Sequence, residues 1–159
     1  MSRYYATMTS PIGELYIFVN DHQVTDITFG KEKELLEEAI YEPSHSIIQE
    51  AICQLDLYFQ GKLVQFQLPI HFEGTPFQQK VWEALQAIPY GETRSYKDIA
   101  KMIGNEKAVR AVGQANRKNR LPIIVPCHRV IGKNGALTGY AGKEVEKKRI
   151  LLQLEGALK

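Results

Sequence analysis

The sequence has 159 residues, which is enough to bury a sizeable hydrophobic core in one domain or in two small ones. It contains no apolar run long enough for a membrane span, and its first residues lack the apolar segment of a signal peptide. Only two cysteines are present, so a disulfide scaffold is not expected. We expect the protein to work in a reducing, cytoplasmic setting.

Charge is distributed unevenly along the chain, although the net charge is only +2. Residues 1–100 carry 7 Lys/Arg and 14 Asp/Glu, a net charge of −7. Residues 101–159 carry 13 Lys/Arg and 4 Asp/Glu, a net charge of +9. A basic segment beside an acidic one favours a binding face for a polyanion such as DNA. An ordinary solvated surface with uneven charge is the alternative that charge alone leaves open.

The first part of the chain has the residue pattern of β-strands. Residues 14–19 and 24–29 are rich in β-branched and aromatic side chains, and the polar stretch 20–23 between them indicates a hairpin. The segment 64–72 alternates loosely and predicts a further strand.

Two helices are predicted between these strands, over 31–41 and 46–59, where apolar residues recur at helical spacing. Cys53 lies off the apolar stripe of the second helix and is expected to be an unreactive packing residue. Together the strands and helices predict an α/β domain with an antiparallel sheet over residues 1–73.

The second domain is predicted over residues 74–159, after the turn-forming stretch Glu73-Gly74-Thr75-Pro76. An apolar stripe over 77–88 predicts an amphipathic helix with Trp82 in the core.

A pair of short helices follows. Ser95 with Asp98 three residues later is a capping-box pattern for a helix that ends near Gly104. Asn105 is the expected N-cap of the next helix, over 106–117. Two short helices joined by a Gly-Asn turn are typical of a DNA-binding helix-turn-helix.

The candidate chemistry lies in the sequence Pro126-Cys127-His128-Arg129-Val130. The apolar run 121–125 before it predicts a buried strand or extended segment that delivers the cysteine. A thiol beside an imidazole is a candidate nucleophile, because the thiolate is the reactive form. In an extended chain the two side chains would point to opposite faces, so a bridging water or a local turn would have to connect them. A buried, inert thiol is the alternative.

From Thr75 to Gly156 the chain resembles the O6-alkylguanine-DNA alkyltransferases, also called methylated-DNA–protein-cysteine methyltransferases. The matching stretches are FQQKVW at 77–82, IPYGET at 88–93, Ser95-Tyr96, AVRAVG at 108–113, IVPCHRVI at 124–131, GYAG at 139–142, and Leu151-Leu152 ahead of Glu155-Gly156. Relatives with tryptophan at the cysteine position bind damaged DNA but accept no alkyl group, so Cys127 favours an active protein. The resemblance implies a ribonuclease-H-like layout for the first domain, and a mostly α-helical, winged-helix-like second domain with a helix-turn-helix.

The resemblance also implies roles for residues that contact DNA. The helix over 106–117 would enter the minor groove, with Arg110 filling the gap left by a flipped nucleotide, because a thiol cannot reach guanine inside the base stack. Tyr96 would assist the rotation and bond to the flipped guanine, making it a better leaving group. Residues that would permit close approach or contact DNA are Ala108, Ala111, Gly113 and Gln114. An ordinary solvated arginine and a core-packed tyrosine are the alternatives for Arg110 and Tyr96.

At the active site the resemblance implies a relay in which Glu155 orients His128 and a water connects the histidine to Cys127. Asn119 would buttress the turn before the active site, and Arg129 is expected to make a structural ion pair. The alkylguanine pocket would be lined by Pro122, Val130, Tyr140 and Ala141. Lys143 and Glu144 follow Gly142 where a second glycine is more usual, which bears on the size of alkyl group that the pocket admits.

These features predict a DNA-repair protein that binds double-stranded DNA carrying O6-alkylguanine. It would flip O6-methylguanine, with O4-methylthymine as a second candidate, and transfer the methyl group irreversibly to Cys127, once per molecule. No cofactor is expected, because the damaged base is the methyl donor, and no metal site, because the histidines and cysteines lack ligand-like spacing. A monomer is expected. The alternative is a non-catalytic DNA-binding regulator or alkylation-damage sensor; a cysteine hydrolase is disfavoured because no oxyanion motif stands out.

Overall fold

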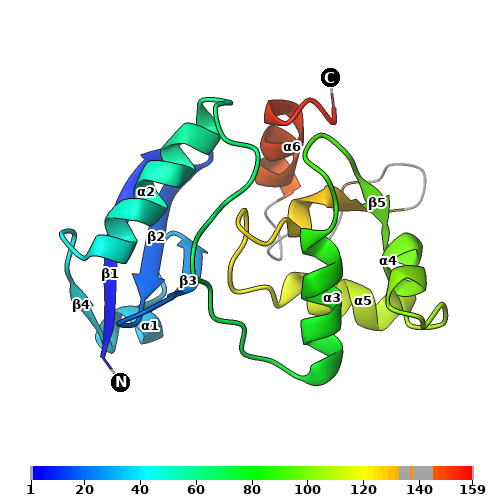
Figure 1. The fold of residues 1–159 in the computed structure, drawn as a ribbon, viewed down its shortest axis with the longest axis horizontal. Helices are drawn as coiled ribbons and strands as arrows, with labels where there is room; N and C mark the ends of the chain where they lie inside the picture. The colour runs from blue at the N-terminus through cyan, green and yellow to red at the C-terminus, as the bar shows by residue number, and fades with distance from the viewer. Residues whose placement is uncertain (1, 133–136, 138–144, 159) are drawn as a thin grey trace. The chain divides into compact units, whose positions relative to one another are not determined.

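The computed structural model describes residues 2–132, 137 and 145–158. The chain divides into two compact units, Met1–Phe72 and Glu73–Lys159, whose elements are labelled in Figure 1. No helix in the described part of the chain is long and apolar enough to cross a membrane.

The first unit is built on a four-stranded sheet in the order β3-β2-β1-β4. Its strands are β1 (Arg3–Ser10), β2 (Gly13–Val19), β3 (Val24–Phe29) and β4 (Ala39–Tyr41). The predicted hairpin between β2 and β3 is confirmed, and both β2 and β3 pair antiparallel with their neighbours. The prediction of a wholly antiparallel sheet is wrong, because β4 pairs parallel with β1. The chain crosses over between β3 and β4, so these two strands run in the same direction.

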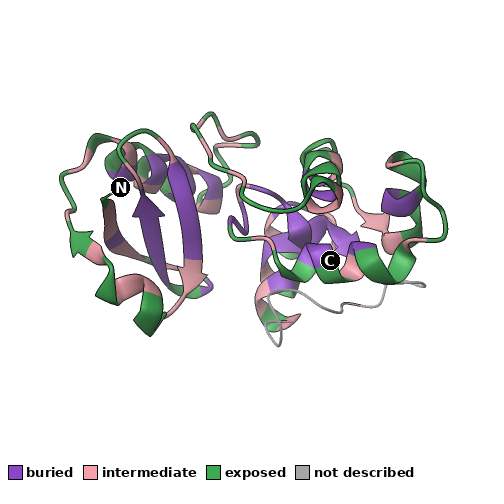
Figure 2. Ribbon diagram, turned by 90° about the horizontal axis from the view of Figure 1, so that it is seen from below, coloured by how far each residue is buried: buried purple, intermediate pink, exposed green. Residues whose placement is uncertain are grey.

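The long helix of this unit packs its apolar face into the core, whereas the short helix α1 (Lys33–Glu37) buries no residue. The predicted helix over 46–59 is confirmed as α2 (Ser46–Phe59), which lies along one face of the sheet in Figure 1. Ile48, Leu55 and Tyr58 are buried on it, and Figure 2 shows that buried residues are concentrated in β2 and β3. Cys53 is exposed, so its expected packing role is wrong. It lies off the apolar stripe, on the side of α2 that faces solvent.

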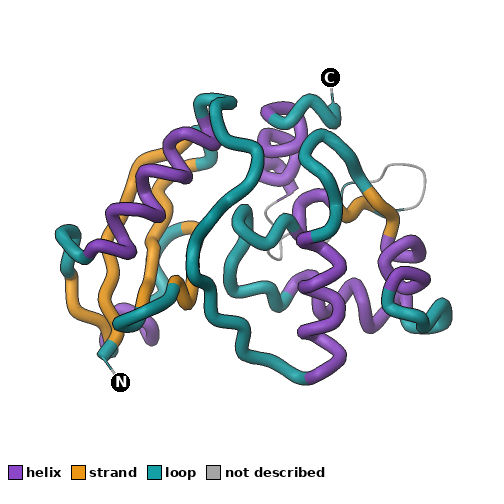
Figure 3. The backbone as a smooth tube through the Cα atoms, viewed as in Figure 1, coloured by secondary structure: helices purple, strands orange, loops and turns teal. Residues whose placement is uncertain are grey.

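Two other predictions for this unit are wrong, because residues distant in the sequence take the backbone hydrogen bonds of the segments concerned. The predicted helix over 31–41 is only α1 (Lys33–Glu37), because the chain then pairs with the edge of β1 as β4. The predicted strand over 64–72 is part of the long loop in Figure 3 and pairs only at an isolated bridge between Ile70 and Val24. The Gln54 side chain bonds both the N–H and the C=O of Gln67, at 2.9 and 3.0 Å, and so occupies backbone groups that a strand would use.

The second unit begins with α3 (Pro76–Gln86), which confirms the amphipathic helix predicted there. Thr75 and Gln78 close a capping box at its N-terminus. Trp82 is 3% exposed, and its indole N–H donates to the carbonyl oxygen of Ala115 at 2.9 Å. The tryptophan is therefore a core residue, as predicted, and it fixes α3 against the helix that carries Ala115.

The helix-turn-helix is formed by α4 (Tyr96–Met102) and α5 (Val109–Arg117). The predicted capping box of Ser95 and Asp98 is confirmed. The second helix starts later than predicted, because Asn105 accepts a backbone hydrogen bond from Ala108 in a turn instead of capping the helix. Ala108 is the N-cap and makes no side-chain capping bond.

Two short strands, a 3₁₀ turn and a last helix complete the described part of the second unit. β5 (Arg94–Ser95) pairs parallel with β6 (Val130–Ile131) in a two-stranded sheet. A single 3₁₀ turn, η1 (Cys127–Arg129), precedes β6, and α6 (Val145–Leu154) packs against that turn. Leu151 and Leu152 of α6 are fully buried in the core of this unit.

Candidate active site and DNA-binding surface

Cys127 lies in the interior of the second unit, with 2% of its surface exposed. It starts the 3₁₀ turn η1, which Arg129 closes by donating its backbone N–H to Pro126 at 3.0 Å. In a 3₁₀ helix successive residues are about 120° apart, so Cys127 and His128 do not point to opposite faces as they would in a strand. The turn is the local geometry that allows the two side chains to serve one site.

The segment before the cysteine is a tight loop, which Val125 closes by donating its N–H to the carbonyl of Leu121 at 2.9 Å, so the prediction of a strand or extended segment over 121–125 is wrong. Asn119 holds both ends of this loop: its Oδ1 accepts the N–H of Leu121 at 2.9 Å, and its Nδ2 donates to the C=O of Val125 at 2.8 Å. Ile123, between them, is buried with φ at 77°, a conformation that costs a β-branched residue on the order of 1–3 kcal/mol. These bonds close a loop in place of the strand and fix the approach to Cys127.

His128 and Arg129 share one carboxylate. His128 Nε2 lies 2.7 Å from Oε2 of Glu155, and Arg129 donates Nε to Oε1 at 2.8 Å and Nη2 to Oε2 at 3.1 Å. Arg129 Nη1 also donates to the carbonyl of Ile88 at 2.7 Å. The predicted structural ion pair of Arg129 is confirmed. Glu155 follows α6, so this cluster joins the turn of the cysteine to the last helix.

Burial leaves the thiol and the imidazole neutral at neutral pH. Desolvation raises the pKa of Cys127 to about 11, against the smaller lowering effects of an Asn119 hydrogen bond and the charge of Lys148. Desolvation also lowers the pKa of His128, more than its bond to Glu155 raises it. The site therefore holds a protonated thiol and a neutral imidazole that can accept a proton.

Lys148 is a buried residue of this region that the sequence did not single out. Its side chain on α6 has 0% exposure, and its Nζ donates a hydrogen bond to the carbonyl oxygen of Val130. The same nitrogen lies 6.0 Å from the centre of the Tyr96 ring. The available signal was its spacing, because Lys148 falls three and four residues before the buried Leu151 and Leu152.

Helix α5 presents an open concave surface of about 380 Å³ on the helix-turn-helix. It is lined by Tyr96, Val109, Arg110, Gly113, Gln114 and Arg117. Gly113 lies beside the Tyr96 ring, since a Cβ there would be 3.9 Å from two ring carbons. Ala111 is also exposed on this helix. The fold therefore brings together Tyr96, Arg110, Gly113 and Gln114, four of the residues for which the resemblance implies DNA contact.

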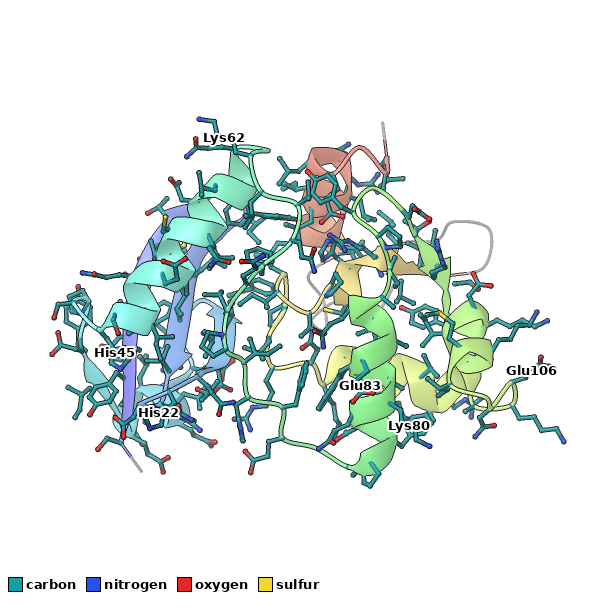
Figure 4. The ribbon with its side chains drawn as sticks, in the orientation of Figure 1. His22, His45, Lys62, Lys80, Glu83 and Glu106 are labelled. Atoms are coloured by element: carbon teal, nitrogen blue, oxygen red, sulfur yellow. The ribbon has the colours of Figure 1, made fainter. Side chains whose placement is uncertain are left out.

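The opposite side of α5 faces the core and contacts the turn that contains Cys127. Asn116 is 1% exposed, and its Nδ2 donates to the backbone carbonyl of Cys127 at 3.4 Å. Figure 4 shows Glu106 at the turn that precedes α5, at the outer end of the unit. The same helix thus carries an exposed surface and a direct contact with the turn of the cysteine.

The remaining predicted pocket residues are only partly placed. Pro122 is buried in the loop held by Asn119, and Val130 follows η1 with its carbonyl bonded to Lys148. Tyr140, Ala141 and the stretch 142–144 lie outside the described residues. Within the described ranges, no group of three or more His, Cys, Asp or Glu is placed to hold a metal ion.

Comparison with known proteins decides the family. The model for the 6-O-methylguanine DNA methyltransferase DNA-binding domain matches residues 76–157, and the model for the ribonuclease-like domain of the same proteins matches residues 3–72. This chain belongs to the 6-O-methylguanine DNA methyltransferase family.

Individual relatives of this methyltransferase family agree along the whole chain. The constitutive methylated-DNA–protein-cysteine methyltransferase of Bacillus subtilis is 52% identical over 96% of this chain and 94% of its own length. That of Methanosarcina acetivorans is 48% identical over 97% and 99%. The crystal structure of Mycobacterium tuberculosis O6-methylguanine methyltransferase superposes with a TM-score of 0.90 at 44% identity, covering 98% of this chain and 93% of that one. A structure of the Mycobacterium tuberculosis protein in complex with DNA gives 0.89 at 45% identity, covering 97% and 93%.

Proposed function

We propose that this methyltransferase repairs DNA by moving the methyl group of O6-methylguanine to the sulfur of Cys127. The observation that carries the proposal is the buried Cys127 turn beside the bonded pair His128 and Glu155, at 2.7 Å. The family assignment supports alkyl transfer from DNA to a protein cysteine as the reaction. O4-methylthymine is a second candidate substrate.

The first step is removal of the thiol proton, because a thiol with a pKa of about 11 is almost entirely protonated at neutral pH. His128 is a neutral base, and its Nε2 faces Glu155, so proton exchange with the thiol uses Nδ1 through a bridging water. Glu155 fixes the ring and stabilises the imidazolium that forms. Arg129 holds the carboxylate in place for that task.

The thiolate then attacks the methyl carbon in line with the leaving group. The S–C bond forms as the bond from carbon to the guanine O6 breaks, and the Tyr96 hydroxyl gives the guanine ring a hydrogen bond or its proton as negative charge develops there. The proton that His128 took from the thiol replaces the one that guanine gains, so the site ends with neutral groups. The products are guanine in DNA and S-methylcysteine. A thioether has no ready reversal, so each molecule acts once, and the damaged base supplies the methyl group without a cofactor.

Base flipping brings the damaged nucleotide to the thiol. The exposed surface of α5 supports this step, because Arg110 and Gln114 share a concave surface with Tyr96. Arg110 takes the place of the extruded nucleotide in the minor groove, where Ala108, Ala111 and Gly113 permit close approach. Pro122, Val130, Tyr140 and Ala141 form the alkylguanine pocket in this proposal.

The proposal also covers the layout of each domain, the oligomeric state of the protein and its location in the cell. We infer a ribonuclease-H-like layout for residues 1–73 and a winged-helix-like layout for residues 74–159. The small sheet of β5 and β6 beside the helix-turn-helix supports the second of these. We also infer that the protein acts as a monomer on double-stranded DNA in the cytoplasm, where thiols stay reduced.

Mass spectrometry tests the proposal. After incubation with a duplex that contains one O6-methylguanine, wild type is expected to gain one methyl group, on the peptide that contains Cys127. Cys127→Ala is expected to gain none while retaining DNA binding, and Cys53→Ala is expected to behave like wild type. DNA binding without any methyl gain would instead support the regulator or damage-sensor alternative.

A further inference from the structure

The turn that follows α3 lies against the buried ion pair of the active site, and the proposed reaction gives this turn no task. The N–H of Glu92 donates to the carbonyl of Pro89 at 3.1 Å and closes the turn. Gly91 has φ at 84°, the left-handed conformation that the third residue of a type II turn requires. Between them, Tyr90 is held at a fixed place beside the ion pair.

Residues of this turn contact both partners of the ion pair, Arg129 and Glu155. The Ile88 carbonyl accepts a hydrogen bond from Arg129 Nη1 at 2.7 Å. The central carbon of the guanidinium group lies over the Tyr90 ring, 5.7 Å from its centre and within cation–π range. Gly91 packs so closely on the last of these elements that a Cβ at its position would lie 3.2 Å from the carbonyl oxygen of Glu155.

The Tyr90 ring holds Arg129 by a different kind of interaction from its hydrogen bonds. Those bonds use Nε and Nη2 toward Glu155 and Nη1 toward Ile88. The ring face attracts the positive charge itself, and this attraction is stronger here because Arg129 is only 7% exposed to water. The Tyr90 hydroxyl lies 3.5 Å from the Leu154 carbonyl, at the outer limit of a hydrogen bond. The ring can therefore be removed while every hydrogen-bonding group of the ion pair stays in the protein.

The position of Arg129 bears on the tautomer of His128 through the Glu155 carboxylate. A carboxylate accepts hydrogen bonds and donates none. His128 is neutral, because burial lowers its pKa, so the imidazole donates its Nε2–H to Glu155 and keeps Nδ1 as the acceptor nitrogen. A carboxylate that turned with a loosened guanidinium group would release Nε2–H and admit the other tautomer, in which Nδ1 cannot take a proton.

We propose that Tyr90 is a positioning residue of the methyl-transfer site. Its ring holds the Arg129 guanidinium group, and Arg129 in turn holds the Glu155 carboxylate in the orientation that receives the imidazole N–H. His128 is thereby kept in the tautomer that accepts the thiol proton. This role rests on His128 being the base of the proposed function.

The first measurement follows the bond between His128 and Glu155 directly. Proton NMR of protein with isotope-labelled histidine gives the rate at which the His128 Nε2–H exchanges with water, at neutral pH and without DNA. Tyr90→Leu keeps apolar bulk without the ring, so exchange should be at least about fivefold faster than in wild type. Tyr90→Phe keeps the ring without the hydroxyl and should match wild type. Unchanged exchange in Tyr90→Leu would overturn the proposal.

A backbone N–H elsewhere in the core separates positioning from a general loss of stability. Val112 is fully buried on α5, and its N–H donates to the Ala108 carbonyl at 2.8 Å. General destabilisation speeds exchange at both places, whereas loss of the ring contact should speed exchange at His128 alone. Equal acceleration of the Val112 and His128 protons in Tyr90→Leu would show a merely structural role and overturn the proposal.

A fluorinated ring separates the attraction for the cation from the shape of the side chain. Pentafluorophenylalanine is nearly the size of phenylalanine, but its ring face repels a cation instead of attracting it. The Tyr90→Phe protein made with this residue at position 90 should keep its fold and exchange the His128 proton as fast as Tyr90→Leu. Exchange as slow as in the ordinary Tyr90→Phe protein would show that the ring only fills space, against the proposal.

The second measurement is single-turnover methyl transfer from a duplex with one O6-methylguanine, at saturating DNA. Tyr90→Leu should be slower than wild type by at least about fivefold, and Tyr90→Phe should match wild type. Tyr41→Leu removes a ring that is 60% exposed on the first unit and is the control, expected to be unchanged. A wild-type transfer rate in Tyr90→Leu would overturn the role in methyl transfer. Failure of the proposed function is seen separately, because wild type itself would then transfer no methyl group.

Discussion

His128 and Glu155 form a buried pair, with 2.7 Å between Nε2 and Oε2. The two residues are 27 positions apart in the sequence, and Arg129, next to His128, bonds to the same carboxylate through two nitrogens. A carboxylate held in this way cannot turn away from the imidazole. The pair therefore couples the orientation of the proposed base to the stability of the second unit, and one substitution tests both.

Glu155→Gln should lower stability and slow methyl transfer. The amide retains the shape of the carboxylate but leaves the buried Arg129 without its charge partner, which costs about 3–5 kcal/mol of unfolding free energy. Urea denaturation measures the first effect, and single-turnover methyl transfer, under conditions where the variant is folded, measures the second. Glu146→Gln on the exposed side of α6 is the matched control and should change neither. Wild-type stability in Glu155→Gln would contradict the role assigned to the ion pair.

Arg110→Ala should separate base flipping from chemistry. We expect slower single-turnover repair of O6-methylguanine in duplex DNA, because both a phosphate-attracting charge and the group that fills the stack are removed. Free O6-benzylguanine needs no extrusion, so its reaction should be much less affected if the pocket admits it. Arg117→Ala, which removes the same charge from the same concave surface, should weaken DNA binding without this selective loss. Equal losses on both substrates in Arg110→Ala would assign Arg110 to the fold or pocket instead.

DNA affinity should decrease as salt increases, because the positive charge of residues 101–159 replaces counterions on the phosphates. Fluorescence anisotropy over a series of salt concentrations gives the slope of log Kd against log salt. Lys118→Ala, at the end of α5, should reduce that slope by about one. Lys62, labelled in Figure 4 just beyond α2 in the acidic part of the chain, is the control, and Lys62→Ala should leave the slope unchanged. A salt-independent affinity would argue against binding through phosphates.

Burial of His128 should make the protein less stable in acid. Its folded-state pKa is lowered, so the unfolded chain binds this proton at about pH 6.5 and the folded chain binds it only at lower pH. The unfolded state then holds more protons, and the unfolding free energy should fall as pH decreases from 6.5 toward the folded-state pKa. Urea denaturation at pH 5 to 8 measures this slope. His128→Gln carries no titrating group and should have a shallower slope, so equal slopes would contradict the assignment.

Local signals in the sequence were sufficient for the elements whose interactions are local. The predicted capping box Ser95–Asp98 starts α4 where expected, because cap and partner are three residues apart. The apolar stripe over 77–88 likewise located α3 to within a residue or two at each end. The predictions failed where a distant partner competed. Residues 39–41 leave their predicted helix to pair with β1, and the Gln54 side chain takes the backbone groups of Gln67. Neither competitor is visible in a local window.

The candidate site divides in the same way. Cys127 and His128 are adjacent in the sequence, and this adjacency alone predicted a thiol nucleophile with a nearby base. Tertiary structure decided that the two residues lie in a 3₁₀ turn and not in a strand, because Asn119 closes the loop before them. It also decided that Glu155 serves both His128 and Arg129, and that a lysine from α6 lies buried against Val130. Burial sets the charge states of these groups. Burial depends on the tertiary structure, because each of these side chains is exposed to water in the unfolded chain.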